Sequence, residues 1–240
     1  MKLKFLIAAT ILPISGTITP ASAATNLIDA TYGPGAGSFE LGSFTPIGAG
    51  NLVFQSLTPG ATNITGWSIG GVGIDWLSTP YYGANQGIHA IDLGYNGLAN
   101  ALGAGAITTV ISTSVGATYN LRFAAAAVSG FPAYTNGGLV NAGSLVNQVF
   151  APAFTPTPND FANQVYTDYN FNFTAVSNST AITFNATDPN SAYGPVIDNV
   201  SVIFVGDAAV PEPATWATTL AGFALIGGAL RGKRKQAAIA

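Results

Sequence analysis

The sequence predicts an all-β protein in which two antiparallel sheets pack together. Short runs rich in β-branched and aromatic residues recur along the chain, and clusters of Gly, Asn, Pro and Ser separate them. In residues 119–123 and 169–173, apolar and polar residues alternate, as in a strand with one buried face. No segment between residues 24 and 210 keeps a helical apolar spacing over several turns. Many short strands at this spacing are typical of a β-sandwich.

Each expected strand is a β-rich run that ends at a turn-forming cluster. Residues 124–127 are all alanine and would also suit a helix, but they continue the alternation of 119–123 and end in Ser-Gly. The predicted strands are, in order, 38–44, 63–69, 73–77, 88–93, 106–113, 118–127, 144–150, 165–176, 180–185 and 196–205.

The charge distribution excludes several classes of protein. Only 7% of the residues are charged, and the chain has 29 Gly and no Cys. Helical bundles and coiled coils are rich in Glu, Lys, Arg and Ala, and nucleic-acid-binding proteins need clustered Lys and Arg. Residues 24–210 contain one basic residue, Arg122, against nine acidic residues, which gives a formal charge of −8. We therefore expect neither helical class and no nucleic-acid partner.

Residues 1–23 have the pattern of a secretory signal peptide. Lys2 and Lys4 precede an apolar run over 5–12, and Ala-Ser-Ala at 21–23 supplies the small residues that signal peptidase needs. An apolar strand or helix of the fold itself is the alternative. We expect cleavage after Ala23 and a β-sandwich domain over 24–209.

Residues 210–235 form a segment of three parts. Residues 214–230 carry no charge, and as a helix of about 25 Å they would cross a thin hydrocarbon core. A basic cluster over 231–235 follows and would stay cytoplasmic. This basic tail, and the prolines before the apolar run, do not suit a buried core helix. We expect a single transmembrane helix over 214–230.

The motif in front of this helix resembles a known sorting signal. Pro211, Glu212 and Pro213, followed by Trp216 and Ala217, resemble the PEP-CTERM signal in its PEPxxWA form. The resemblance implies that an exosortase recognises the motif after export by way of signal peptidase. It also implies a transient inner-membrane anchor, and then the cell surface or extracellular matrix of a Gram-negative bacterium that makes extracellular polysaccharide.

Five motifs follow one another in the domain before this signal: GSFELG, ITGWSIGGVGIDWLS, NQGIHAIDLGYNG, GAITTVISTSVGATYNLRF and YGPVIDNVSVI. Together they resemble the secreted galactose-binding-like jelly rolls of the choice-of-anchor C type. They are also similar to the domain of unknown function of plant cell-wall proteins and, more distantly, to carbohydrate-binding modules. The resemblance spans most of 26–205. It implies a jelly-roll sandwich that binds carbohydrate without catalysing a reaction, with extracellular polysaccharide as partner.

Few residues of the domain suit catalysis. Without Cys there is no thiol nucleophile, and the single His89 is not accompanied by the Gly-x-Ser-x-Gly motif of a serine hydrolase. A glycosidase needs two carboxyl groups at a set separation, and no acidic residue lies in a recognisable motif of that kind. We expect that the protein is not an enzyme. A small secreted glycan hydrolase is the weaker alternative.

Glu40 and Asp198 are the candidate metal ligands. In the galactose-binding-like modules that this chain resembles, the matching Glu and Asp hold a structural Ca²⁺, which takes six to eight oxygen ligands. Here the Phe-Glu of the first motif is kept, but the Asn that usually opens it is missing. The alternative is that Glu40 is solvated and that Asp198 accepts hydrogen bonds from backbone N–H groups.

Three aromatic residues are the candidate ligand-binding side chains. Trp76, Tyr81 and Tyr82 lie close together in the sequence, and flat rings stack on the apolar faces of sugars. The alternative is that Trp76, like Trp67, belongs to the core. We therefore expect a carbohydrate-binding surface or matrix protein. A structural surface or floc protein with no small ligand, which a smooth Ser/Thr/Asn surface would favour, is the main alternative.

Overall fold

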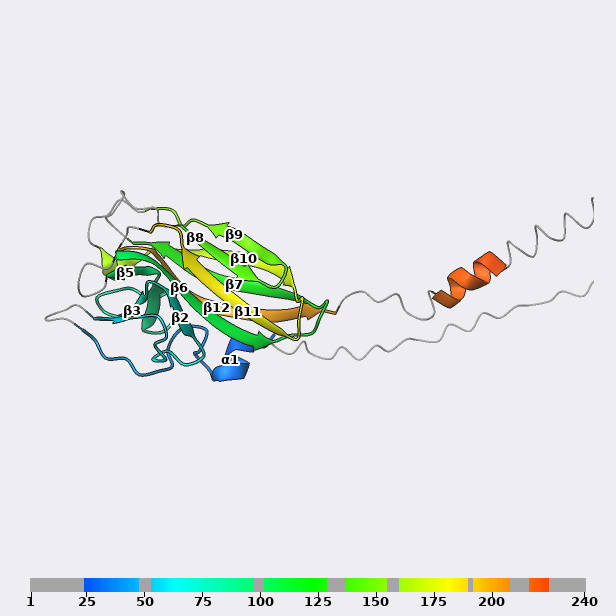
Figure 1. The fold of residues 1–240 in the computed structure, drawn as a ribbon, viewed down its shortest axis with the longest axis horizontal. Helices are drawn as coiled ribbons and strands as arrows, with labels where there is room; N and C mark the ends of the chain where they lie inside the picture. Colours follow the sequence, from blue (N-terminus) through cyan, green and yellow to red (C-terminus); the bar gives the residue numbers. More distant parts are fainter. Residues whose placement is uncertain are drawn as a thin grey trace, which may run out of the picture.

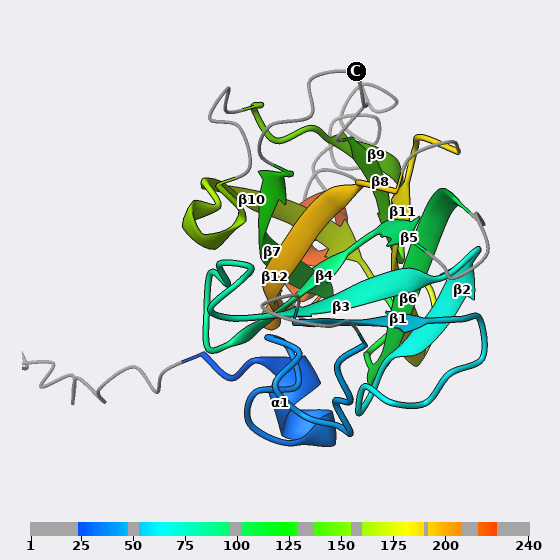
Figure 2. The same cartoon turned by 90° about the vertical axis from the view of Figure 1, so that its left-hand side faces the viewer.

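The computed structural model describes residues 24–47, 53–96, 102–128, 137–154, 160–189, 192–207 and 216–224. Every paired strand in this part of the chain runs antiparallel to its neighbours. The strands form two sheets that face each other, with a short helix, α1 (Leu27–Tyr32), at one end (Figures 1 and 2). The predicted all-β antiparallel sandwich is therefore confirmed.

The first sheet has the strand order β1-β3-β4-β12-β7-β10. Its strands are β1 (Phe54–Leu57), β3 (Ile74–Ser78), β4 (His89–Asp92), β7 (Thr118–Ala127), β10 (Tyr166–Thr174) and β12 (Pro195–Gly206). The second sheet has the order β2-β6-β11-β8-β9, and β5 pairs with β6 beside this path. Its strands are β2 (Ser68–Gly71), β5 (Gly94–Asn96), β6 (Leu102–Ser112), β8 (Gly138–Ala142), β9 (Leu145–Phe150) and β11 (Ser179–Ala186).

The main core lies between the two sheets. Alternate residues of β7, Tyr119, Leu121 and Phe123, point into it, as the alternating sequence predicts. The ring of Phe123 lies 4.9 Å from that of Phe184 on β11 in an edge-to-face arrangement, which joins the two sheets. Trp67 is also buried, and its Nε1 donates to the Ala36 carbonyl at 2.9 Å.

A second apolar cluster covers the opposite, outer face of the first sheet. It contains Leu77, Ala126 and Val196 from the sheet, with Tyr82 and Phe161 from the segments that cover it. Phe161 begins a single 3₁₀ turn, η1 (Phe161–Asn163). Because this cluster lies over β7, residues 124–127 are buried on both faces, which explains why a strand there is built from alanine.

The beginning of the domain differs from the sequence prediction. Residues 38–44 form turns and one isolated bridge rather than a strand, and α1 precedes them. Asn26 caps α1: its Oδ1 accepts from the N–H groups of Ile28 and Val202, at 3.1 and 3.0 Å. A helix of six residues is too short to show a periodic pattern, so the sequence did not reveal it. The strands β1, β5 and β8 were also missed.

The predicted signal peptide and the predicted C-terminal sorting segment lie mainly outside the described residues. The signal peptide over 1–23 and the residues Pro211, Glu212 and Pro213 are not described. Of the predicted membrane helix over 214–230, the structure describes 216–224 as a helix, and Trp216 and Ala217 form its first turn. Among the described residues, no helix combines the length and the apolar character that crossing a membrane requires.

Candidate functional site

The outer face of the first sheet carries four carboxyl side chains. In the sheet register, Asp75 on β3 lies opposite Asp92 on β4, and Asp198 on β12 shares the neighbour Ala124 with Asp168 on β10. On three of these strands a residue directly adjacent to the acid (Trp76, Ile91 or Ile197) points the other way, into the main core. The strand alternation therefore directs the acidic side chains to the outer face.

Two of these carboxyl groups are buried beside each other. Asp75 and Asp92 are 4% and 2% exposed. Ser56 Oγ donates to Asp75 at 2.6 Å, and the N–H groups of Gly94 and Gly194 both donate to Asp92 Oδ1, at 2.7 and 2.8 Å. Burial raises the pKa of Asp75 to about 6. Burial also raises the pKa of Asp92 well above its usual range, and the neighbouring Asp75 charge adds to this.

Asp198 accepts hydrogen bonds from the backbone of the segment 85–89. It is completely buried, and its Oδ2 accepts from the N–H groups of Asn85 and Gln86, at 2.7 and 2.8 Å. Its Oδ1 accepts from Asn199 N–H at 2.6 Å. Burial raises the pKa of Asp198 to about 7; the three backbone donors oppose this shift and the charge of Glu40 adds to it.

Glu40 holds the same loop from the other side. Its Oε1 accepts from the N–H groups of Ile88 and His89, both at 2.8 Å. The structure thus brings Glu40 and Asp198 to the two ends of the segment 85–89. Asp198 accepts from backbone N–H groups, as in the alternative to calcium binding. That alternative also expected a solvated Glu40, whereas Glu40 accepts from N–H groups as well.

The pair supplies two oxygen-bearing side chains, of the kind that calcium prefers. Carbonyl groups would have to supply most of the remaining ligands. Within the described ranges, no group of three or more His, Asp or Glu side chains is placed to hold a metal ion. Calcium at Glu40 and Asp198 stays a prediction.

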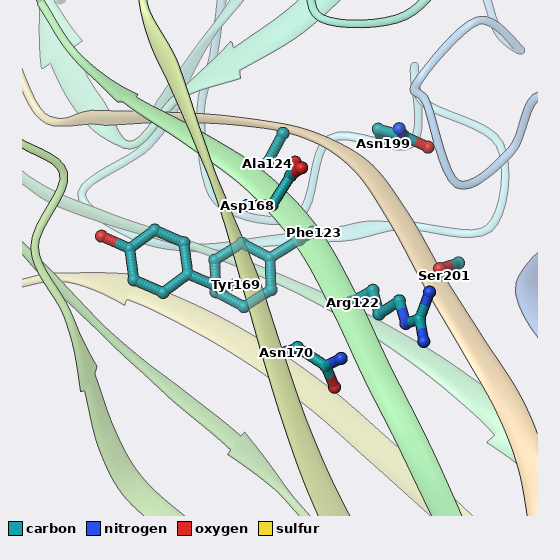
Figure 3. A pocket seen from close by; sticks show the side chains of 8 residues that line it. All are labelled: Arg122, Phe123, Ala124, Asp168, Tyr169, Asn170, Asn199 and Ser201. Atoms are coloured by element: carbon teal, nitrogen blue, oxygen red, sulfur yellow. The ribbon is translucent and has the colours of Figure 1, made fainter.

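Beside this buried region, the outer face opens into a polar pocket of about 490 Å³ (Figure 3). Its position follows from the sheet register. In one row, Arg122 on β7 lies between Asn170 on β10 and Ser201 on β12. In the next row, Ala124 lies between Asp168 and Asp198, and its small side chain leaves the space open. The lining residues are Arg122, Phe123, Ala124, Asp168, Tyr169, Asn170, Asn199 and Ser201.

Hydrogen bonds fix the polar side chains on one side of this pocket. Arg122 Nε donates to Asn120 Oδ1 at 2.8 Å, and Asn120 Nδ2 donates to the side-chain oxygens of both Asn170 and Asn172. Within the part of the chain that the structure describes, no further hydrogen bond or ion pair reaches the guanidinium. The terminal N–H groups of Arg122 therefore remain able to donate to a ligand.

On the other side of the pocket, Asn199 Nδ2 donates to Asn85 Oδ1 at 3.2 Å. Asn199 follows Asp198 directly, so the pocket wall is continuous with the loop that Asp198 and Glu40 hold. Behind the pocket, the rings of Phe123 and Tyr169 stack at 5.2 Å, which fixes β7 against β10. The pocket therefore offers a guanidinium, a carboxylate, amides and a hydroxyl on a rigid support.

The predicted aromatic ligand site is corrected by the structure. Trp76 is 1% exposed and packs edge-to-face against Phe44, so its indole cannot stack on a sugar. This is the core role that the sequence left open. Tyr82 is also buried, in the second apolar cluster, and Tyr81 packs against it and against Phe161. Tyr82 is thus part of the apolar cluster that covers the sheet, and Tyr81 lies half-buried beside it.

His89 has a structural role. Its ring is buried against Phe44 and Trp76, and its Nδ1 lies 3.0 Å from the Leu77 carbonyl oxygen. No carboxylate and no hydroxyl of a Ser, Thr or Tyr side chain is hydrogen-bonded to the ring within the described residues. The arrangement therefore lacks the partners of a catalytic histidine.

Comparison with known proteins identifies the family. Residues 36–203 match the family described as "Protein of unknown function (DUF642)". The chain belongs to the DUF642 family. The DUF642 match includes every strand of both sheets except the last residues of β12, and it also includes all residues that line the pocket. No curated protein sequence matches the chain.

Several solved structures are similar to parts of this chain at low sequence identity. A cyclase from Fischerella sp. TAU is 13% identical (TM-score 0.43), with 64% of this chain and 89% of that chain covered. An adhesin domain of Lys-gingipain from Porphyromonas gingivalis W83 is 15% identical, with a TM-score of 0.42 and with 70% of this chain and 96% of that chain covered. TmCBM61, solved in complex with β-1,4-galactotriose, is 12% identical, with a TM-score of 0.37 and with 76% of this chain and 100% of that chain covered. These structures have different functions, so likeness at this level does not choose among them.

Proposed function

We propose that this protein is an exported, non-catalytic glycan-binding protein and that the polar pocket on the first sheet is its binding site. The observation that carries the proposal is the composition of this pocket. Arg122, the one basic residue of the whole 24–210 region, lies there among Asp168, Asn170, Asn199 and Ser201. Sugar hydroxyls both donate and accept hydrogen bonds, so a set of fixed donors and acceptors of this kind suits them.

The charges favour a neutral glycan. Arg122 and Asp168 lie in the same pocket without an ion pair between them within the described residues, so one can donate to sugar oxygens and the other can accept from sugar hydroxyls. The surrounding 24–210 region has a formal charge of −8, which repels an acidic polysaccharide. A polymer of uncharged hexoses meets no such repulsion.

The carboxyl groups support binding rather than hydrolysis. A glycosidase needs two carboxyl groups that both reach the scissile bond. Asp168 is the acidic residue among those that line the pocket, whereas Asp75, Asp92 and Asp198 are buried and engaged by hydrogen bonds.

A second function, as a structural coat protein without a small ligand, is favoured by the hydroxyl-bearing outer face of the second sheet. On this face the hydroxyl groups of Thr108 and Thr183 are hydrogen-bonded to each other across the strands.

The sorting of the protein belongs to the same proposal. A signal peptide over 1–23 would export the chain, and a helix over 214–230 would hold it in the inner membrane with residues 231–235 inside. An exosortase would then act at or near Pro211, Glu212 and Pro213. The order of the three parts along the chain supports this: the prolines on both sides of Glu212 disfavour a helix or a sheet there, and the basic tail favours the cytoplasmic side.

A glycan array tests the binding function. The full chain, held in detergent micelles and labelled on lysine, is applied to printed neutral and uronic-acid-containing glycans at physiological salt. We expect binding to neutral hexose polymers and weaker binding to uronic-acid polymers of the same length. Absence of binding to every glycan would favour the coat protein, and the release of shorter products from the printed glycans would favour the hydrolase.

A further inference from the structure

We propose that one end of the sandwich is a lipid-contacting surface, which lies on the membrane into which the following segment, 214–230, inserts. We call this end the exit tip and define it as the turns 113–117 and 175–178 with the end of β12 at 204–206. The chain leaves the domain here (Figure 1). The inference rests on the membrane anchor of the proposed function, but not on glycan binding.

Four large apolar side chains project from the exit tip into solvent. Val115 is 63% exposed, Val176 67%, Phe204 47% and Val205 59%. Single exposed apolar residues are ordinary on a protein surface, but these four lie at the same end of the molecule. Such a cluster is typical of a surface that contacts a partner or a membrane.

The exit tip is rigid. Gly116 N–H donates to the Ala175 carbonyl at 2.8 Å, and Ala175 N–H donates back to the Ala117 carbonyl at 2.9 Å, which ties the two turns together. Tyr119 joins them to β12: its ring lies 5.7 Å from that of Phe204, and its hydroxyl accepts from Ser114 N–H at 2.8 Å. The two turns and the end of β12 are therefore held together, and their apolar side chains share one surface.

The charge at the exit tip suits the headgroup region of a bilayer. Neither turn contains a charged residue, and Asp207, directly after the end of β12, is the one acid next to the exit tip along the chain, although the 24–210 region as a whole is strongly acidic. Ser114, Ser177 and Asn178 are exposed and surround the valines with groups that hydrogen-bond to water and phosphate. An apolar centre with an uncharged polar rim can enter the interface of an anionic membrane, whereas the acidic remainder of the domain is repelled.

The chain that follows brings the exit tip to the membrane. β12 ends at Gly206, and the uncharged apolar run begins at residue 214, so residues 207–213 span at most about 25 Å even when fully extended. The described part of that run, helix 216–224, exposes Trp216, Leu220 and Phe223, which share one helical face. If this run lies in the bilayer, the exit tip is the part of the domain closest to it.

The absence of cysteine makes a direct test possible. Val176→Cys places one thiol on the exit tip, and Val165→Cys is the matched control, because Val165 is 55% exposed next to the opposite end of β10. Each full-length variant is labelled with an environment-sensitive fluorophore and reconstituted into vesicles of phosphatidylcholine and phosphatidylglycerol. Emission is measured with and without phospholipids that carry a nitroxide quencher near the headgroup.

We expect the label at 176 to shift to the blue and to be quenched several-fold more strongly than the label at 165. Equal quenching at the two positions, in protein that floats with the vesicles, would overturn the exit-tip proposal and leave the anchor intact. Protein that does not float would overturn the anchor and the exit tip together. A blue shift that follows protein concentration and resists the lipid quencher would assign the exit tip to a second copy and contradict our proposal. None of these results depends on glycan binding.

Discussion

At the scale of single residues, the unusual feature is a pair of acids that face each other on adjacent strands inside a cover of apolar side chains. Asp75 and Asp92 have hydrogen-bond donors but no cationic partner within the described residues. Burial therefore favours the neutral form of each carboxyl group, and the charge of one raises the pKa of the other. The stability of the fold should depend on pH as a result.

The sign of this dependence follows from Asp75. Its pKa is 3.8 in the unfolded chain and about 6 in the fold, so its contribution is fully present below pH 3.8 and is lost as the pH rises through 6. The shift corresponds to about 3 kcal/mol of the free energy of unfolding. We predict that Asp75→Asn, which imitates the neutral acid, is more stable than the wild type at pH 8 and similar to it at pH 4.

Urea unfolding at the two pH values measures this difference. Asp207→Asn is the control, because it makes the same chemical change at an exposed carboxyl group. A wild-type protein that becomes more stable between pH 4 and pH 8 would contradict the prediction, as would an unchanged pH dependence in Asp75→Asn.

The calcium prediction also belongs to single residues. An ion held by Glu40 and Asp198 would stabilise the folded state, because the unfolded chain cannot hold both ligands together. We predict that a chelator lowers the melting temperature of the wild type and that excess Ca²⁺ restores it. Asp198→Asn should melt at one temperature in both conditions. A wild type that is indifferent to chelator would leave the five backbone N–H groups as the sole partners of the two carboxylates.

At the scale of strands, Gly105 in β6 allows the backbone at Gly73 and at Leu93 to approach β6 closely. A Cβ added to Gly105 would lie 2.0 Å from the Gly73 carbonyl oxygen and 2.7 Å from that of Leu93. Backbone atoms on both sides cannot move away independently, so we predict that Gly105→Ala lowers the free energy of unfolding by about 2–4 kcal/mol.

The matched control lies on the neighbouring strand. A Cβ at Gly70 of β2 would meet the Ala106 Cβ at 3.4 Å and the Ala106 carbonyl oxygen at 3.9 Å, which are ordinary contacts, and φ there is not positive. Gly70→Ala should therefore be neutral, or stabilising by less than about 1 kcal/mol. Chemical denaturation compares the two variants. Equal losses of stability would show that the approach of β5 and β2 to β6 is not limited by Gly105.

The strands also show what the sequence could and could not predict. Alternation located β7 and β10, because each has one face in the main core. The sequence could not tell which face of β3 is covered, since all five residues of that strand are buried. An exposed Trp76 was therefore one of the two alternatives from the sequence, and the structure places its ring in the core.

The pocket was missed for a related reason. Arg122, Asp168 and Ser201 come from three strands that are distant in the sequence, and only the sheet register places them together. One signal was available: Arg122 is the sole base in a long acidic region, and it occupies an outward position of an alternating strand. The pairing of Glu40 with Asp198 came from a family resemblance, and the structure does bring both to one loop.

At the scale of the whole molecule, we expect that the sandwich is released from its anchor. Prolines flank Glu212 on both sides, and proline disfavours helix interiors and sheet ladders, so we expect a protease to be able to bind this motif. We predict that protein recovered from the outer surface or matrix lacks the residues after about position 213. Mass spectrometry checks this in a host with its exosortase and in a strain without it. Surface protein from the normal host that still ends in Ala240 would contradict the prediction.

The central claim, that the pocket on the first sheet binds a glycan, is tested most directly by titrating pocket variants with the best glycan of the array. Asp168→Asn and Arg122→Lys change one group each, and Asp207→Asn makes the same chemical change as the first variant outside the pocket. We predict that both pocket variants lose at least about tenfold in affinity at an unchanged melting temperature, and that Asp207→Asn binds like the wild type. Wild-type affinity in Asp168→Asn and Arg122→Lys would contradict the assignment of the pocket as the glycan site.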